Sequence, residues 1–229
     1  MRTVRPGGLE GIESLAPDEV AARLAAAVAD GPHTATMDGA LACVARWGLA
    51  KTTLDDVARA SGCSRATVYR QFPGGKTALL EAVVTREIGR LLLACVVPAD
   101  SADDLEEYLI EVIVTAARYL DRHEALGYLL RHEPETLAPW LAFDRLDAVL
   151  AVARAVLVPA SLRFADATRA EEAIEWAARM VISYTLTPSP TVQLTRRDDA
   201  RRLVSTYLGP GVPLGPMDQA PPIHFPIPC

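Results

Sequence analysis

The sequence predicts an all-α protein. Apolar residues recur at spacings of three and four along most of the 229 residues, which is the period of an amphipathic helix. The alternating apolar and polar runs and the Asn-Gly turns that indicate β-hairpins do not occur. Half of the residues are hydrophobic, but no apolar run approaches the roughly 20 residues that cross a bilayer. We therefore expect helices around a substantial core, in one or two domains.

Proline and glycine delimit the helices expected in the first part of the chain. Pro17 and Asp18 favour the beginning of an Ala-rich helix, because proline at the first helical position loses no hydrogen bond. Gly48 ends the next helix and Gly62 separates two short ones, because glycine adopts the left-handed conformation that closes a helix. The expected helices cover residues 17–30, 34–47, 53–60, 64–71 and 75–97.

Caps and prolines delimit the helices of the second part. Ser101 precedes acidic residues that suit a first helical turn, and Thr168 is the expected cap of a later helix. Pro134, Pro159 and Pro188 mark helix ends. The expected helices are 101–122, a short segment before 134, a helix that ends before 159, 167–186 and 197–208. A tail with seven prolines, expected to be extended or disordered, follows at 209–229.

Positive charge is concentrated in one small part of an acidic chain. The net charge is −6, yet residues 34–81 hold six basic and four acidic residues, whereas residues 1–33 and 82–229 are both acidic. A basic module is compatible with nucleic-acid binding whatever the average charge. The N-terminus lacks the apolar segment of a signal peptide, and the four cysteines lie far apart without a CxxC pair. We therefore expect a reduced, cytoplasmic protein that does not contact a membrane.

Residues 52–72, TTLDDVARASGCSRATVYRQF, have the order of a helix-turn-helix: a short helix, a turn with glycine and a second short helix. Val68 and Phe72 are spaced to face the core. The opposite face of the second helix is short and rich in hydrogen-bond donors, which suits entry into a major groove. On spacing alone, such a face is more often simply a solvated surface. This face contains Arg65, Ala66, Thr67, Tyr69 and Arg70.

Residues 34–81 resemble the DNA-binding domain of the TetR family of transcriptional repressors. The matching features are Thr52-Thr53, Val57-Ala58, Gly62, the run at 64–72 and a lysine at the start of the next helix. The resemblance implies an N-terminal three-helix helix-turn-helix domain, joined by a long helix to a C-terminal helical domain for ligand binding and dimerisation. The expected parts are an extension with a short helix at 1–33, the DNA-binding domain at 34–81, the ligand-binding and dimerisation domain at 82–208 and the tail at 209–229.

The resemblance also implies which residues contact DNA. Thr53, Tyr69 and Lys76 are expected to contact phosphates. Ser64, at the start of the recognition helix, is also expected to contact DNA. Gly74 and Gly75 make the turn before the lysine one residue longer than the usual family pattern. Arginine can bind guanine through two hydrogen bonds, and small methyl groups can meet the thymine methyl. The expected base contacts are Arg65, Ala66, Thr67 and Arg70.

Beyond residue 82, the chain resembles the family only in length and helical layout. In the family these helices surround an effector pocket and the last two long ones form the dimer interface, so 167–186 and 197–208 are expected to pair with a second copy. Arg131, His132 or Glu133 would anchor a polar group of the effector or simply mark a solvated helix end. The pocket candidates are apolar or aromatic, which indicates a hydrophobic or amphipathic effector but also suits core packing. They are Tyr108, Val112, Tyr119, Leu126, Leu130, Trp140, Phe143, Trp176, Met180 and Tyr184.

The expected function is ligand-responsive regulation of transcription: a homodimer binds a palindromic DNA operator, represses, and is released by a small effector. One alternative is a helix-turn-helix activator or regulator without a small-molecule inducer, and another is a scaffold that has lost DNA binding. An enzyme is not expected, because HExxH, GxSxG and phosphate-binding glycine motifs do not occur. His123 and His132 lie nine residues apart, on opposite sides of a straight helix, so neither a metal nor another cofactor is expected.

Overall fold

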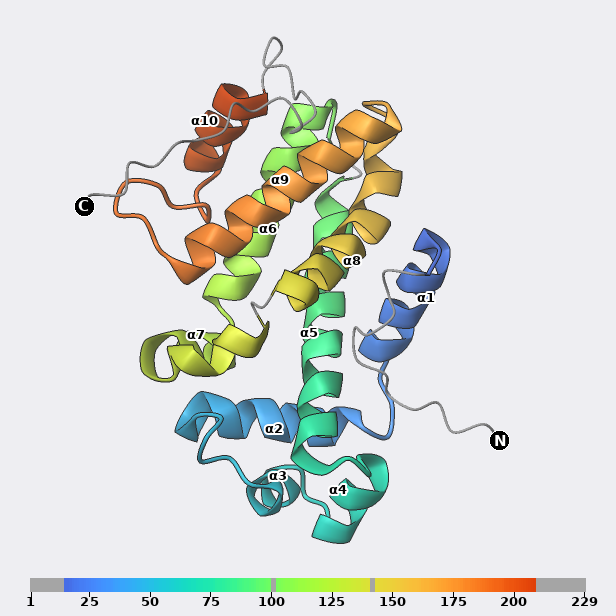
Figure 1. Cartoon of the computed structure of the whole chain (residues 1–229), viewed down its shortest axis with the longest axis vertical. Helices are drawn as coiled ribbons and strands as arrows, with labels where there is room; N and C mark the ends of the chain where they lie inside the picture. The colour runs from blue at the N-terminus through green and yellow to red at the C-terminus, as the bar shows by residue number, and fades with distance from the viewer. Residues whose placement is uncertain (1–14, 100–101, 141–142, 209–229) are drawn as a thin grey trace, which may run out of the picture.

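A computed structural model describes residues 15–99, 102–140 and 143–208 (Figure 1). These residues form α-helices and one 3-10 helix without a strand, which confirms the all-α prediction. In chain order they are α1 (Pro17–Val28), α2 (Thr34–Trp47), α3 (Leu54–Ala60), α4 (Arg65–Gln71), α5 (Gly75–Ala99), α6 (Leu105–Asp121), α7 (Glu124–His132), the 3-10 helix η2 (Pro134–Trp140), α8 (Phe143–Ser161), α9 (Ala167–Leu186) and α10 (Arg197–Leu208).

Several predicted helix ends are wrong, among them the caps of two helices and the end of a third. Asp104 caps α6 by accepting the N–H three residues on at 2.8 Å, whereas the expected cap, Ser101, lies outside the described residues. Asp166, not Thr168, caps α9 in the same way at 2.9 Å. Helix α8 continues through Pro159 for two further residues. This proline removes one backbone hydrogen bond, and only the last residues of α8 follow it.

Buried apolar side chains form two clusters that share helix α5. The smaller cluster joins α2, α3, α4 and the first half of α5, and it includes Val68 and Phe72, as their spacing predicts. The larger cluster joins α1, α6, α8, α9 and α10 with the second half of α5. In Figure 1, α2, α3 and α4 gather at one end of the molecule, and α5 extends from them into the other helices. Because α5 is one continuous helix, it connects the two clusters directly.

Helix α1 packs against α5 and α8 and belongs to the larger cluster. Val20 and Leu24 are both 1% exposed. Gly89 of α5 permits this close approach, since a methyl group there would lie 2.8 Å from Val28 Cγ2. The short helix expected within residues 1–33 is thus packed on the helices of the C-terminal part rather than on the helix-turn-helix.

Candidate nucleic-acid interface

Helices α3 and α4 form a helix-turn-helix whose beginnings are capped by side chains. The Thr53 hydroxyl accepts the Asp56 N–H at 3.2 Å, and the Asp56 carboxylate accepts the Thr53 N–H at 3.2 Å, which makes a reciprocal capping box. Ser64 caps α4 by accepting the N–H of Thr67 at 3.1 Å. Gly62 has a φ of +65°, the left-handed conformation in which glycine carries no steric penalty. Both helices are therefore fixed by local interactions.

The inner face of α4 is anchored to the beginning of α2. Phe72 is 1% exposed and the His33 ring meets it edge-on, with 5.4 Å between the ring centroids. The Gln71 amide donates to the Pro32 carbonyl at 2.7 Å, and its oxygen accepts from the Thr36 hydroxyl at 2.6 Å. The sequence analysis missed the role of Gln71 because its partners lie more than thirty residues earlier in the chain.

The outer face of α4 is open to solvent. Arg65, Ala66 and Arg70 are exposed, and Tyr69 is 43% exposed. The Arg65 guanidinium lies over the Tyr69 ring, 5.5 Å from its centroid, and 3.2 Å from the carboxylate of Asp55 on α3. Both side chains of this ion pair are more than half exposed, so the pair is weak and can exchange for another anion. The face presents two cations and an aromatic hydroxyl on a short, rigid helix.

The other predicted DNA contacts lie around this face and already have partners within the protein. The Thr53 hydroxyl donates to the carboxylate of its capping partner at 2.6 Å. The hydroxyls of Ser64 and Thr67 lie 2.9 Å apart. Lys76 Nζ donates to the Leu49 carbonyl at 2.6 Å, which uses one of the three donors of its ammonium group. Contacts of all eight predicted residues with DNA stay predictions.

Polar and ionic groups gather around Glu87, midway along α5. Its Oε1 accepts from Arg86 Nε at 3.2 Å and from Arg90 Nη1 at 3.1 Å. Its Oε2 accepts from the Tyr119 hydroxyl at 2.8 Å and lies 3.5 Å from His123 Nε2. Arg86 is buried and also lies 2.7 Å from a carboxylate oxygen on α2. We call this set the Glu87 cluster: Asp38, Arg86, Glu87, Arg90, Tyr119 and His123.

The Glu87 cluster joins α2, α5, α6 and α7, and it holds Glu87 ionised. Burial alone would raise the pKa of Glu87, but hydrogen bonds from His123 and Tyr119 and the charges of Arg86 and Arg90 lower that pKa to about 2. Burial and the hydrogen bond to Glu87 raise the pKa of Tyr119. Tyr119, predicted as a pocket residue, has its hydroxyl committed to this cluster. The sequence analysis missed the cluster because its members lie on separate helices.

The predicted pocket residues fall in several environments. Tyr108 and Val112 are buried in the larger apolar cluster, and the Tyr108 hydroxyl donates to the Leu157 carbonyl at 2.7 Å. The side chains of Trp140 and Phe143 lie outside the described residues. Pocket roles for the whole set stay predictions. The half-buried members are Tyr119, Leu126, Leu130, Trp176, Met180 and Tyr184.

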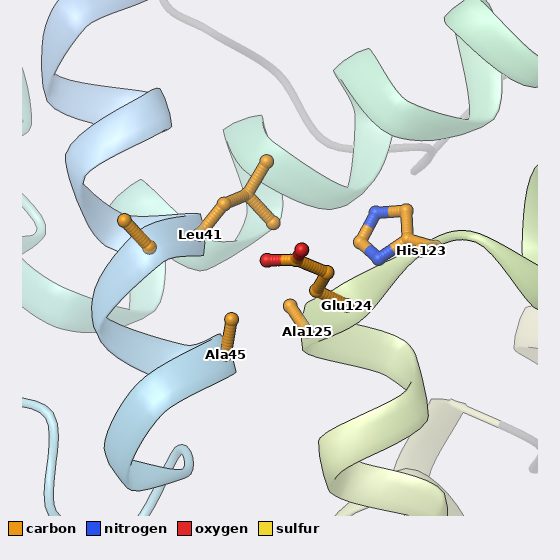
Figure 2. Close-up of a pocket in the computed structure, with 6 residues that line it drawn as sticks. Leu41, Ala45, His123, Glu124 and Ala125 are labelled. Atoms are coloured by element: carbon orange, nitrogen blue, oxygen red, sulfur yellow. The ribbon is translucent and has the colours of Figure 1, made fainter.

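A groove with a volume of about 320 Å³ opens between α2 and α7 (Figure 2). The side from α2 is apolar, whereas the side from α7 adds an imidazole and a carboxylate. Figure 2 shows Leu41 and Ala45 on one helix facing Glu124 and Ala125 on the other. None of the eight predicted pocket residues whose side chains the structure describes lines this groove. Its lining residues are Leu41, Ala42, Ala45, His123, Glu124 and Ala125.

Helices α9 and α10, the predicted dimer surface, carry aromatic side chains that are incompletely buried. Trp176 of α9 and Tyr207 of α10 lie with their ring centroids 6.3 Å apart, and Tyr207 is 54% exposed. Helix α10 is held against α6 by ion pairs from Arg197 to Glu107 and Glu111. The structure thus presents these aromatic groups on a fixed surface.

The cysteines of the described segments are unpaired. Burial raises the pKa of the Cys43 thiol, and it raises the pKa of Cys95 to about 12. Cys229 lies outside the described residues. In the described part of the chain, the His, Cys, Asp and Glu side chains form no group of three or more that could hold a metal ion. None of the helices described there is both long enough and apolar enough to span a membrane.

Known proteins match this chain in sequence. Residues 37–83 match the model of the bacterial regulatory proteins of the tetR family. An HTH-type transcriptional regulator of Mycobacterium tuberculosis H37Rv, Rv1255c, itself uncharacterised, is 30% identical over 159 residues, which cover 69% of this chain and 73% of that protein. A second uncharacterised HTH-type regulator, Mb2274c of Mycobacterium bovis, is 34% identical over 79 residues, or 34% of this chain and 40% of that protein.

Two solved structures share the fold. The TetR family repressor AlkX from Dietzia sp., implicated in the biodegradation of n-alkanes, aligns over 78% of this chain and 95% of its own, with a TM-score of 0.58 and 22% identity. The fatty acid degradation regulator FadR from Bacillus halodurans aligns over 77% and 96%, with a TM-score of 0.54 and 17% identity. The helix-turn-helix geometry, the family match and the coverage of the mycobacterial relative together show that this chain is a transcriptional regulator of the TetR family.

Proposed function

We propose that the chain is a cytoplasmic, homodimeric repressor that binds a palindromic operator and is released by a small hydrophobic or amphipathic effector. The observation that carries this proposal is the outer face of α4, where exposed cations and a tyrosine project from a helix whose inner face is fully packed. A rigid helix of this kind loses little conformational entropy when it enters a major groove.

The roles of the α4 side chains follow from their chemistry. Arg65 and Arg70 suit bidentate hydrogen bonds to guanine, and Ala66 suits contact with a thymine methyl. Tyr69 suits a phosphate, because the residue is 43% exposed and its hydroxyl can donate a hydrogen bond. In the free protein Arg65 forms an exposed ion pair with Asp55. A phosphate or a base would replace Asp55 as its partner, because such an exposed pair is weak.

The dimer would form through α9 and α10, as the resemblance to the family implies. Tyr207 is more than half exposed and Trp176 beside it is half-buried, and a second copy would remove both rings from water. Two copies related by a twofold axis present two α4 helices, which matches a palindromic site. The effector would bind among the helices of the larger apolar cluster, whose apolar side chains favour an apolar ligand.

Selection of DNA from a random duplex library, followed by fluorescence anisotropy with the selected duplex, tests the proposed DNA binding. Tyr69→Phe is expected to weaken binding to all sequences to a similar extent, because a phosphate contact carries no base information. Arg65→Ala is expected to relax the preference at particular bases. Arg122→Ala removes the same charge from an exposed residue remote from α4 and is the matched control. Failure of the wild-type protein to select any duplex would refute the proposal.

The effector is tested separately with the same complex. Fatty acids and other amphipathic compounds are added to the protein–DNA complex, and the anisotropy is followed. A compound that raises the thermal stability of the free protein is expected to release the DNA, because a ligand shifts the equilibrium only by its differential affinity for the two states. Stabilising compounds that leave the complex intact would favour a regulator without a small-molecule inducer.

A further inference from the structure

The end of helix α7 contacts the turn that leads into the helix-turn-helix. Glu133, the C-cap of α7, places its Oε2 2.8 Å from the backbone N of Leu49 and 3.1 Å from that of Ala50, and it accepts both N–H groups. These bonds join residues 84 and 83 positions apart in the chain. We call this pair of hydrogen bonds the Glu133 contact. It links the C-terminal part of the molecule directly to residues 48–52, which precede α3.

The turn is shaped to receive this carboxylate. Gly48 has a φ of +84°, and a methyl group there would lie 2.8 Å from Tyr128 Cε1 and closer still to Glu133 Oε1. The carbonyl groups of the turn also have hydrogen-bond partners. Lys76 donates to the Leu49 carbonyl, and the Thr52 hydroxyl donates to the Gly48 carbonyl at 2.7 Å. The turn is therefore held from α5 and from α7 at once.

The backbone of Glu133 is itself held by hydrogen bonds. Its N–H donates to the Leu129 carbonyl at 2.8 Å, and its own carbonyl accepts from both the N–H and the hydroxyl of Thr136, at 3.0 and 2.7 Å. The neighbouring rings of Tyr128 and His132 pack with centroids 4.6 Å apart. A movement of α7 would consequently be transmitted to the carboxylate rather than absorbed by its backbone.

The other end of α7 is fixed to α5. His123 caps α7 by accepting the Leu126 N–H on Nδ1 at 3.1 Å, so the proton of the neutral imidazole lies on Nε2, which faces Glu87. Helix α7 thus spans from the Glu87 cluster to the Glu133 contact. It also carries Leu126 and Leu130, two of the predicted effector-pocket residues, between those two attachments.

We propose that Glu133 is a positioning residue for DNA binding: its carboxylate sets the orientation of the helix-turn-helix relative to the C-terminal part, and so the separation of the two α4 helices in a dimer. This inference rests on the proposed dimeric DNA-binding function. Charge-assisted hydrogen bonds to two adjacent N–H groups are strong and directional, so they constrain this orientation at the turn, in addition to the Glu87 cluster. Effector-induced movement of α7 would act through the same contact.

Equilibrium binding to two duplexes tests the proposal. The first is a palindromic site that the wild-type protein selects from a random library, and the second is the same duplex with one half-site scrambled. Glu133→Ala is expected to lose about tenfold or more in affinity for the palindrome, because the two recognition helices no longer keep their separation, and less than about twofold for the half-site. Glu133→Gln is expected to lie between Glu133→Ala and the wild type, since its amide oxygen still accepts N–H groups without a charge.

A matched control and a second measurement make the result unambiguous. Glu135→Gln removes the same charge from an exposed residue of η2 and is expected to bind both duplexes as the wild type does. Hydrogen exchange of the Leu49 and Ala50 amides is expected to accelerate in Glu133→Ala. Wild-type affinity of Glu133→Ala for the palindrome would overturn the proposal. Equal losses on the two duplexes would overturn it as well, because Glu133 would then only maintain the fold of the helix-turn-helix.

The failure of this inference is distinguishable from the failure of the proposed function. A wild-type protein that selects no duplex overturns the proposed function, and this inference with it. A wild-type protein that selects a palindrome, together with Glu133 variants that bind it unchanged, overturns this inference alone.

Discussion

Arg65 and Arg86 are both arginines beside carboxylates, and their surroundings are opposite. Arg65 on α4 is 61% exposed and pairs only weakly with Asp55, which is 52% exposed. Arg86 on α5 is 1% exposed and lies between Glu87 and Asp38. An exposed pair contributes little to stability and remains available to another anion. A buried pair cannot be broken without leaving an uncompensated charge.

Burial, rather than residue type, separates the proposed DNA-binding surface from a structural joint in this protein. The outer face of α4 keeps its cations in water, where DNA can reach them. The Glu87 cluster uses the same chemical groups to fasten four helices at the point where the helix-turn-helix meets the rest of the chain. Substitutions that separate stability from DNA binding test this distinction.

Arg86→Met is expected to have the largest effect, a loss of about 3–5 kcal/mol in the free energy of unfolding. The methionine keeps much of the side-chain length but leaves Glu87 without its buried cation. Urea denaturation followed by circular dichroism measures the change. Arg59→Met, at an arginine that is 76% exposed, is the matched control and is expected to stay within about 0.5 kcal/mol of the wild type. Equal losses in both variants would erase the contrast between buried and exposed arginines.

Glu87→Gln is expected to change the dependence of stability on pH. The pKa of Glu87 lies at about 2 in the folded protein, against an ordinary value of 4.5. A lowered carboxyl pKa contributes stability that is complete above pH 4.5 and is lost as the pH falls through about 2. The variant should therefore lose about 3 kcal/mol at pH 7 and show a flatter decline between about pH 5 and 2. Denaturation at a series of pH values measures this, with Glu135→Gln as the control that should keep the wild-type profile.

Arg70→Ala is expected to leave stability unchanged and to reduce discrimination between bases at one position of each half-site. A lost bidentate contact corresponds to a decrease of roughly five- to one-hundred-fold in the preference for the correct base. Anisotropy titrations with single-base variants of the selected duplex measure the preference. An equal loss of affinity for all of the duplex variants would mean that Arg70 contacts a phosphate rather than a base.

Asp55→Asn is expected to have the smallest effect. The change releases Arg65 from its exposed partner, so DNA affinity should rise by less than about threefold at low salt, while the free energy of unfolding stays within experimental error. Titrations at two salt concentrations measure the gain, which should shrink as the salt increases. Weaker DNA binding by Asp55→Asn would mean that the carboxylate orients Arg65 rather than competing with DNA.

Much of the helix-turn-helix could be predicted because its determinants are local. The spacing of Val68 and Phe72 identified the buried face of α4, and Gly62 marked the turn, where the structure has the expected positive φ. The predicted ranges of α2, α9 and α10 agree with the structure. The wrong caps, Ser101 and Thr168, arose because several hydroxyl and acidic residues near each helix start compete for the same role.

The sequence by itself determined the helical fold and the face of α4 that meets solvent, because periods of three and four residues and short turn motifs act between near neighbours in the chain. Its resemblance over residues 34–81 indicated the family. Only the tertiary structure revealed the Glu87 cluster and the Glu133 contact. Their partners lie on different helices, and Glu133 reaches residues more than eighty positions away. Sequence spacing carries no information about such pairings, because they depend on how whole helices pack against one another.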